Sequence, residues 1–262
     1  MIYTVTFNPA LDYVMNLKQL QYKDINRTES EQLYYGGKGI NVSVILSRLK
    51  VDNIALGFLA GFSGKKIEEM LNAENIKNDF VYLKKGYTRI NVKIKADEDY
   101  DINAQGPDIE LDELNALFDK FEKLKSGDFL VLAGSIPNSL PDDIYEEILA
   151  KLQNKGINFA VDATGDLLLN VLKYKPFLIK PNHHELGDVF GVEVKTEKEI
   201  AYYAKKLQEM GARNVLVSRS KDGATLVDEF GMGAFSMIVV EDMSNKQAAA
   251  LEKKIEGIDH VK

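Results

Sequence analysis

Short apolar strands alternate with amphipathic helices along most of this chain, and polar side chains gather where the strands end. The β-branched and apolar runs predict strands at residues 2–7, 54–59, 128–133, 157–161, 176–179, 214–218 and 225–227. Apolar residues at helical spacing predict helices between them. Such alternation is typical of a doubly wound α/β sheet, in which mostly parallel strands carry helices on both faces. We therefore predict a single α/β domain over residues 1–262, with a cleft along the edge where the strands end.

Two segments of the chain depart from this pattern. Residues 13–35 are polar with scattered aliphatic side chains, and residues 86–104 contain a run that alternates strictly between apolar and polar side chains. Strict alternation is typical of a strand that has one buried face and one face in water. We predict that these two segments form a small β-sheet that lies over the cleft as a lid. Arg89 would reach from this lid into the cleft, whereas Lys93 and Lys95 are expected on its outer surface.

The composition of the chain limits the ligands that it can bind and the cellular locations that it fits. The net charge of −7 disfavours a surface for nucleic acid or for an anionic membrane. The chain has no cysteine, which excludes disulfides and thiolate ligands, and its three histidines make a histidine metal site unexpected. Its first residues lack the basic and apolar segments of a signal peptide, and no apolar run reaches the length of a membrane span. We expect a cytoplasmic protein that binds neither nucleic acid nor membrane.

The densest polar cluster is the turn before the first long predicted helix, where Gly36, Gly37, Lys38 and Gly39 follow one another. Glycines permit positive φ and let a ligand approach the backbone closely. The start of a helix presents unpaired N–H groups that attract an anion, and Lys38 adds a full positive charge there. Asn41 offers both a donor and an acceptor for a hydroxyl group. By itself the turn is equally compatible with a solvated lysine, and its spacing is not that of a P-loop.

Other predicted strand ends also carry polar residues, namely Asp12, Gly134 with Ser135, Asp162, Asn182 with Glu185, and residues 218–223. Asp12 follows the first strand, where it could bind a ligand or simply cap a turn. Asn182 and Glu185 lie three positions apart where a helix begins. A carboxylate there could hold a hydrated Mg²⁺, although the same pair is a common N-terminal cap. The polar turn over residues 218–223 could cradle a phosphate or be a plain hairpin.

Taken together, these motifs resemble the ribokinase-like (PfkB) sugar kinases, and within them the branch of 1-phosphofructokinase and tagatose-6-phosphate kinase. The resemblance covers about residues 1–229. The matching stretches are Thr4-Val5-Thr6-Phe7-Asn8-Pro9-Ala10-Leu11-Asp12, Gly36-Gly37-Lys38-Gly39-Ile40-Asn41-Val42, Thr88-Arg89-Ile90-Asn91, Gly134-Ser135-Ile136-Pro137, Lys180-Pro181-Asn182-His183-His184-Glu185-Leu186 and Val217-Ser218 through Gly223-Ala224. The motifs also occur in the same order as in the family. For each motif this combination favours a binding role over a purely structural one.

The resemblance implies a kinase that uses ATP and Mg²⁺ to phosphorylate a hydroxyl of a phosphosugar, either fructose 1-phosphate or tagatose 6-phosphate. The substrate-binding residues that it implies are Asp12, Gly37, Lys38, Asn41, Arg89 and Ser135. The cofactor-binding residues that it implies are Lys180, Asn182, Ser218, Ser220 and Gly223, with Glu185 in indirect contact with Mg²⁺. Family members often pair through their lids, so the resemblance also implies a homodimer in which Arg27 is a candidate contact.

Two other classes of enzyme fit the sequence less well. A kinase for ribose or nucleosides has less use for Arg89 and Lys38, whose cations suit a substrate that is already phosphorylated. A Rossmann dehydrogenase would carry Gly-x-Gly-x-x-Gly after its first strand, where this chain has Asn8-Pro9-Ala10.

The chain departs from the family pattern near its C-terminal end. Family members carry a Gly-Ala-Gly-Asp turn whose amides stabilise the transferred phosphoryl group and whose aspartate accepts the hydroxyl proton. No such turn is found here, so no catalytic residue is assigned, and a family segment is inferred to be absent near residues 229–232. Either the natural protein contains a segment that this sequence lacks, or the protein is a regulatory relative that binds without turnover. The other motifs are intact, which favours the first explanation, although Ser220 stands where many relatives have glycine.

Overall fold

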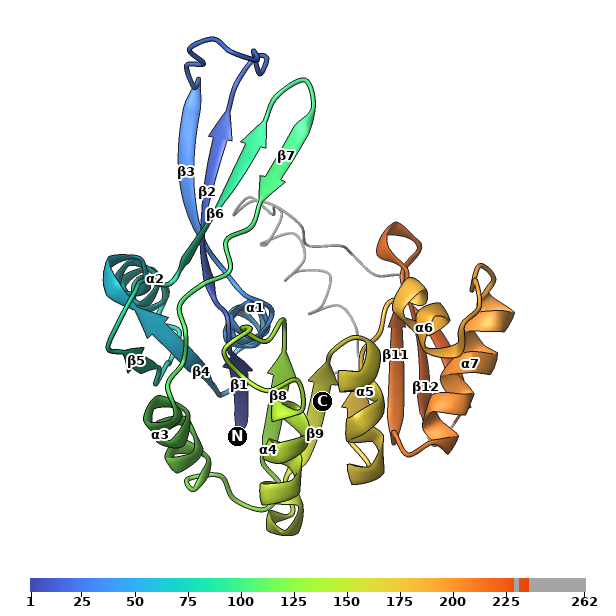
Figure 1. Ribbon diagram of the computed structural model, residues 1–262. Coiled ribbons are helices and arrows are strands. Elements are labelled where there is room, and N and C mark those ends of the chain that lie inside the picture. Colours follow the sequence, from blue (N-terminus) through green and yellow to red (C-terminus); the bar gives the residue numbers. More distant parts are fainter. Residues whose placement is uncertain (229–230, 236–262) are drawn as a thin grey trace.

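The computed structural model describes residues 1–228 and 231–235, with a large sheet and a smaller sheet that projects from it (Figure 1). The large sheet has nine strands in the order β13-β12-β11-β10-β9-β8-β1-β4-β5. Its strands are β1 (Ile2–Thr6), β4 (Asn53–Ala60), β5 (Val81–Leu83), β8 (Phe129–Ala133), β9 (Asn158–Asp162), β10 (Leu178–Ile179), β11 (Asn214–Ser218), β12 (Ala224–Asp228) and β13 (Gly231–Phe235). From β5 to β11 every neighbouring pair runs parallel, and β12 and β13 add antiparallel pairs at the edge. The predicted mostly parallel α/β class is confirmed.

The order of the strands reverses between β1 and β8. Moving outward from β1, β4 and β5 follow on one side, whereas β8, β9, β10 and β11 follow on the other. At such a point the connections after two adjacent parallel strands diverge and leave a crevice at the carboxyl ends of the strands. The chain after β1 leads to Asp12, and the loop after β8 begins with Gly134 and Ser135. The topology therefore brings two of the predicted motifs to one edge of the sheet.

Helices cover both faces of the large sheet. They are α1 (Lys38–Arg48), α2 (Gly61–Ala73), α3 (Leu111–Phe121), α4 (Ile144–Leu152), α5 (Gly165–Val171), α6 (His183–Phe190) and α7 (Glu197–Glu209). One buried cluster joins α1 and α2 to β4 through Ala55 and Leu59, and the other joins the later helices to the opposite face through Leu56 and Phe58. Because β4 is buried on both faces, its sequence is apolar almost throughout. Within the described residues, no helix is both long and apolar enough to cross a membrane.

The smaller sheet is formed by the segments that the sequence assigned to a lid, and we call it the lid sheet. Its strands, in the order β3-β2-β6-β7, are β2 (Ala10–Asn16), β3 (Ser30–Gly36), β6 (Arg89–Lys95) and β7 (Asp99–Ile102). β2 follows β1 after a short turn, so the lid sheet grows directly out of the centre of the large sheet (Figure 1). The predicted second sheet is thus present, and its first strand starts before residue 13.

The inferred deletion near residues 229–232 lies partly outside the described residues. Gly231–Phe235 pairs with β12 along its whole length. This glycine-containing stretch is therefore an edge strand and not a phosphate-binding turn, in agreement with the sequence, which offered no substitute for Gly-Ala-Gly-Asp there.

Candidate active site

Helix α1 begins directly against the end of β1, and at two positions, Gly37 and Gly39, no residue larger than glycine fits. Gly37 has a φ of 127°, and a Cβ on it would lie 2.7 Å from Thr6 Cγ2. A Cβ on Gly39 would lie 2.5 Å from Thr6 Oγ1 and 2.6 Å from the Val5 carbonyl oxygen. The Ile40 N–H donates to Thr6 Oγ1 at 2.9 Å, which fixes this close approach. The glycine turn therefore holds the N-terminus of a helix at the carboxyl end of the central strand.

Lys38 and Asn41 are exposed at the start of the same helix. The Lys38 ammonium lies 3.1 Å from Asp162 Oδ1, and the Lys180 ammonium lies 3.2 Å from Asp162 Oδ2. The Asp162 side chain is only 13% exposed, whereas the lysine side chains are 49% and 39% exposed. One largely buried carboxylate thus joins the lysine predicted for the sugar to the lysine predicted for the nucleotide. Asp162 was not among the predicted site residues, although its position at the end of a predicted strand was a signal for it.

The loop after β8 borders Lys38. Gly134 has a φ of 106°, and a Cβ on it would lie 3.7 Å from Lys38 Cβ. The Tyr145 hydroxyl donates to the Gly134 carbonyl oxygen at 3.0 Å. Burial, together with the charge of Asp162, raises the pKa of Tyr145, so its hydroxyl keeps the proton that this bond requires. Ser135 follows as an exposed residue of the same loop.

Residues of β6 surround the carboxylate of Asp12. Asn91 Nδ2 donates to Asp12 Oδ1 at 2.9 Å, and the Lys93 ammonium lies 3.3 Å from Asp12 Oδ2. Asn91 is buried, and its amide oxygen accepts the Ala104 N–H at 3.2 Å. The expectation that Lys93 lies on the outer surface is therefore wrong. Residues two apart on a strand share a face, so the spacing of Arg89, Asn91 and Lys93 already carried this information.

Arg89 is partly buried where the lid sheet meets the large sheet. Its Nε donates to the Asn8 carbonyl oxygen at 3.2 Å, and its Nη1 donates to the Ala104 carbonyl oxygen at 3.3 Å. Asn8 Nδ2 donates in turn to the Gln105 carbonyl oxygen at 2.8 Å, which ties the segment after β7 to the end of β1. Burial lowers the pKa of Arg89 and Asp12 acts to raise it, but a guanidinium stays charged at neutral pH. It also has more donors than these two bonds use.

The ends of β10 and β11 bring together residues predicted for the nucleotide. Asn182 Oδ1 accepts the Glu185 N–H at 2.9 Å, and Glu185 Oε2 accepts the Asn182 N–H at 2.7 Å. This reciprocal cap is the plainer alternative that the sequence left open, and it uses one oxygen of each side chain. Asn182 also forms an isolated parallel bridge with Ser218, whose N–H donates to the Pro181 carbonyl oxygen at 3.1 Å. The two strand ends are therefore direct neighbours.

The loop after β11 contains a strained residue. Ser220 has a φ of 50°, a left-handed conformation that favours glycine. Gly223 has a φ of 91°, and its carbonyl oxygen accepts the Arg219 N–H at 2.8 Å. Arg219 Nη2 lies 3.1 Å from Glu197 Oε1, so the loop is tied to the first residue of α7. Ser220, which stands where many relatives have glycine, thus adopts a backbone conformation that favours glycine.

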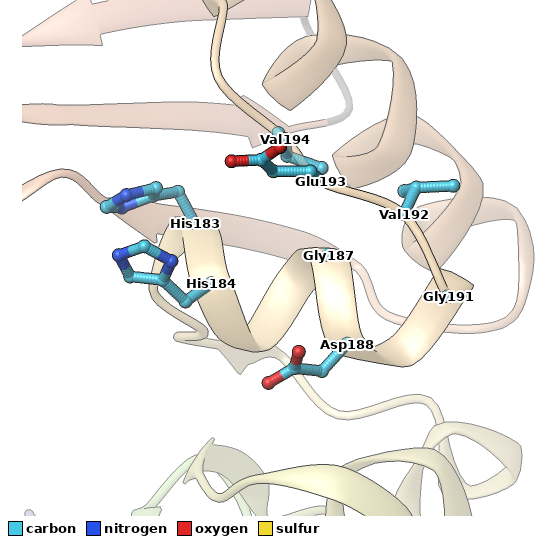
Figure 2. A pocket seen from close by; sticks show the side chains of 8 residues that line it. All are labelled: His183, His184, Gly187, Asp188, Gly191, Val192, Glu193 and Val194. Atoms are coloured by element: carbon cyan, nitrogen blue, oxygen red, sulfur yellow. The ribbon is translucent and has the colours of Figure 1, made fainter.

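An open groove of about 440 Å³ runs along α6 beside these residues. Figure 2 shows the imidazoles of His183 and His184 together at the start of the helix, with Glu193 on the segment that follows it. The two ring centroids are 3.9 Å apart. None of the residues that line the groove was predicted as a site residue. Two of the lining residues, His183 and His184, lie between Asn182 and Glu185 in the chain, so the groove adjoins the candidate site.

The carboxylates of the candidate site can be compared with the ligands that Mg²⁺ requires. Among the described residues, no group of three or more histidine, aspartate or glutamate side chains is placed to hold a metal ion. Asp162 is already paired with two lysines, whereas the cap uses only one oxygen of Glu185. Mg²⁺ commonly keeps several waters and binds through one or two carboxylates together with substrate phosphates. The residues present therefore fit an ion that arrives with a nucleotide better than a resident ion.

Comparisons with known proteins show the family to which the chain is similar. The family described as pfkB family carbohydrate kinase matches residues 5–241. The chain is 46% identical over 226 residues to a 1-phosphofructokinase of Bacillus subtilis, covering 86% of this chain and 74% of that protein. It is 39% identical over 229 residues to a D-tagatose-1-phosphate kinase of Bacillus licheniformis, covering 87% and 75% of the two chains. Among solved structures, phosphofructokinase-2 from Escherichia coli in complex with fructose-6-phosphate is similar, with a TM-score of 0.84, 26% identity, and coverage of 95% of this chain and 84% of that one.

Proposed function

The chain belongs to the pfkB family of carbohydrate kinases, and we propose that it transfers the γ-phosphoryl group of ATP to a hydroxyl of a ketohexose phosphate. The observation that carries this proposal is the bridge from Lys38 through Asp162 to Lys180. A kinase of this kind must bring two anionic substrates together, and repulsion between their phosphates opposes that approach. Two cations held on one carboxylate, between the sugar motif and the nucleotide motif, supply preorganised positive charge where the phosphates must meet.

On the sugar side, we assign the first contacts to Asp12 and Arg89. The Asp12 carboxylate can only accept hydrogen bonds, so it suits the hydroxyl groups of a sugar. The planar Arg89 guanidinium can bind the phosphate that the sugar already carries through two parallel hydrogen bonds. The turn at Gly37, with Asn41 and Ser135 beside it, would complete the acceptor site.

On the nucleotide side, the proposed ATP contacts are Lys180, Asn182, Ser218, Ser220 and Gly223. Glu185 would hold Mg²⁺ through water, since one of its oxygens already accepts the Asn182 N–H. When bound, the ion neutralises charge on the ATP phosphates.

Phosphoryl transfer depends mainly on positioning and on electrostatic stabilisation, because the protein has little covalent chemistry to perform. The lid sheet would exclude water, so that the phosphoryl group goes to the sugar rather than to solvent. The acceptor hydroxyl must also lose a proton, and the family aspartate that accepts it is not in this sequence. We propose that the natural protein supplies this residue from a segment inserted near residues 229–232.

The names of the relatives narrow the choice of acceptor. Both the Bacillus subtilis and the Bacillus licheniformis relative are named for a sugar 1-phosphate. We therefore propose fructose 1-phosphate or tagatose 1-phosphate, and tagatose 6-phosphate becomes the less favoured isomer. We also propose a cytoplasmic location, because both substrates are charged metabolites.

The apolar face of the lid sheet supports a homodimer. Tyr13 pairs with Leu33 and Val92, and Val92 pairs with Ile102, so these side chains share the face opposite to that of Asp12. Leu33 is 41% exposed and Ile102 is 59% exposed. A second copy would bury this face against its own, with Arg27 of the β2–β3 loop near the contact. Light scattering should then give twice the monomer mass, and Ile102→Asp should give a monomer.

The test of the proposed function is release of ADP from ATP when fructose 1-phosphate or tagatose 1-phosphate is added. Turnover with either sugar, and none with unphosphorylated fructose, supports it. Because the aspartate turn is missing from this sequence, the alternative is a regulatory protein that binds the sugar phosphate without releasing ADP. The intact mass of the natural protein separates the two, since 29.4 kDa fits the present sequence and a larger mass fits an additional segment. Absence of both turnover and binding contradicts the proposal.

A further inference from the structure

Lys93 has no role in the function proposed above, yet it lies on the same lid face as Arg89 and Asn91. Its ammonium lies 3.3 Å from Asp12 Oδ2, while Asn91 donates to Asp12 Oδ1 at 2.9 Å. Two neighbouring side chains of β6 therefore hold the two oxygens of one carboxylate.

We propose that Lys93 is a positioning residue, which fixes the Asp12 carboxylate in the orientation that receives the hydroxyl groups of the acceptor sugar. This inference rests on the proposed function, because Lys93 acts through Asp12 and the binding of sugar by Asp12 is itself proposed.

Orientation is the first part of the argument. The terminal torsion of an aspartate is broad, so one hydrogen bond fixes its carboxylate only in part. Asn91 is itself held, since its oxygen accepts the Ala104 N–H at 3.2 Å, but its amide reaches only Oδ1 of Asp12. The contact of Lys93 with Oδ2 restrains the remaining rotation. Each oxygen still has a further lone pair for a sugar hydroxyl.

Charge is the second part of the argument. The Asp12 side chain is only 14% exposed, and a carboxylate removed from water needs a partner. Arg89, the neighbouring cation on this face, directs its Nε and Nη1 to the carbonyl oxygens of Asn8 and Ala104. Among the described residues, Lys93 is thus the cation in direct contact with Asp12.

Lys95 offers a matched control. It lies on the same strand and the same face, and its ammonium lies 2.7 Å from Asp99 Oδ2. Its side chain is 40% exposed, against 34% for Lys93. Lys95→Met therefore removes a similar cation from the lid sheet while the contact between Lys93 and Asp12 stays in place.

The test is isothermal titration calorimetry of the full chain with fructose 1-phosphate, with tagatose 1-phosphate and separately with MgATP. Lys93→Met should weaken binding of the sugar phosphate about tenfold and change MgATP binding by no more than about twofold. Lys93→Arg should restore most of the lost affinity, because a guanidinium can bind the same carboxylate. Lys95→Met should bind both ligands like the wild type. Combined with Asp12→Asn, Lys93→Met should have no further effect, because two changes that act through one group are not additive.

Each outcome bears on the inference. Equal losses for the sugar phosphate and for MgATP, additive losses with Asp12→Asn, or no recovery in Lys93→Arg contradict the positioning role. Tight binding by the wild type that is unchanged in Lys93→Met contradicts this inference alone. Failure of the wild type to bind either sugar phosphate contradicts the proposed function, and the inference falls with it.

Discussion

The two sides of the crevice hold their candidate residues in different ways. On the sugar side, Asp12 on β2 is held by Asn91 and Lys93 on β6, two strands that are far apart in the sequence. On the nucleotide side, Asn182 and Glu185 hold each other within the first turn of α6. The sugar side is therefore organised by contacts between separate elements, and the nucleotide side by contacts within one element.

This difference affects how each side should respond to ligands and to substitution. Groups held by other elements are fixed before a ligand arrives, which lowers the entropy cost of binding. The cap of α6 is instead held within one element, so it depends less on the packing of the rest of the fold. Substitutions on the sugar side should therefore have large effects that depend on the whole fold, whereas those on the nucleotide side should have smaller and more local effects.

The largest expected effect is a loss of stability at Gly39. In Gly39→Ala, the new Cβ would lie 2.5 Å from Thr6 Oγ1 and 2.6 Å from the Val5 carbonyl oxygen, so α1 must move away from β1. We expect the free energy of unfolding in urea to fall by about 3 kcal/mol. The control is Gly165→Ala, where φ is 56° and nothing lies within 4 Å, so only backbone strain of about 1 kcal/mol is expected. Equal losses in both variants would contradict the close packing of α1 on β1.

The next effect concerns sugar binding. Asp12→Asn keeps the shape of the side chain but removes the charge and half of the acceptor capacity. We expect the dissociation constant for fructose 1-phosphate to rise about thirtyfold, or about 2 kcal/mol, with little change for MgATP. Calorimetry measures both constants, and a thermal melt checks the fold. A collapsed melting temperature would show that Asp12 is structural rather than a ligand-binding residue.

On the nucleotide side, Glu185→Gln should have a smaller effect. The amide can still accept the Asn182 N–H, but it loses the charge that favours both the helix N-terminus and a hydrated Mg²⁺. We expect a loss of stability of about 0.5 kcal/mol and about fivefold weaker binding of MgATP, with sugar binding unchanged. A loss of sugar affinity as large as that of MgATP would remove the proposed separation of the two sides.

The smallest expected effect is a gain of stability. Ser220→Gly relieves a φ of 50° in the loop after β11, and part of the benefit is offset by the greater freedom of glycine in the unfolded chain. We expect the free energy of unfolding to rise by about 0.5 kcal/mol. A drop in stability would mean that the Ser220 side chain contributes more than its strained backbone costs.

Local patterns were sufficient to predict most elements of the fold. The apolar run at residues 214–218 became β11, and the alternating run around Arg89 became β6 of the lid sheet. The glycines before α1 were predicted as a turn, because few other residues adopt their conformation. In each of these cases the decisive physical preference lies within a few neighbouring residues.

Contacts between distant strands were beyond such patterns. The spacing along β6 places Lys93 on the face of Arg89. Nothing near Lys93 in the sequence shows that β6 pairs with β2 and brings this face to Asp12. The bridge from Lys38 to Lys180 through Asp162 depends on the order of the strands in the sheet, which no local motif encodes. The same limitation explains why β13 was not predicted, since this glycine-containing edge strand forms by pairing with β12.

The most direct test of the central claim compares two ligands on one variant, Arg89→Ala, by calorimetry. The claim is that the lid sheet binds the phosphate of the sugar, while the ends of β10 and β11 bind the nucleotide. Arg89→Ala should weaken fructose 1-phosphate binding about a hundredfold and leave MgATP binding within about twofold of the wild type. A thermal melt shows whether loss of the hydrogen bonds from Arg89 to Asn8 and Ala104 destabilises the fold. Equal losses for both ligands, or no loss for the sugar phosphate in a folded variant, would contradict the claim.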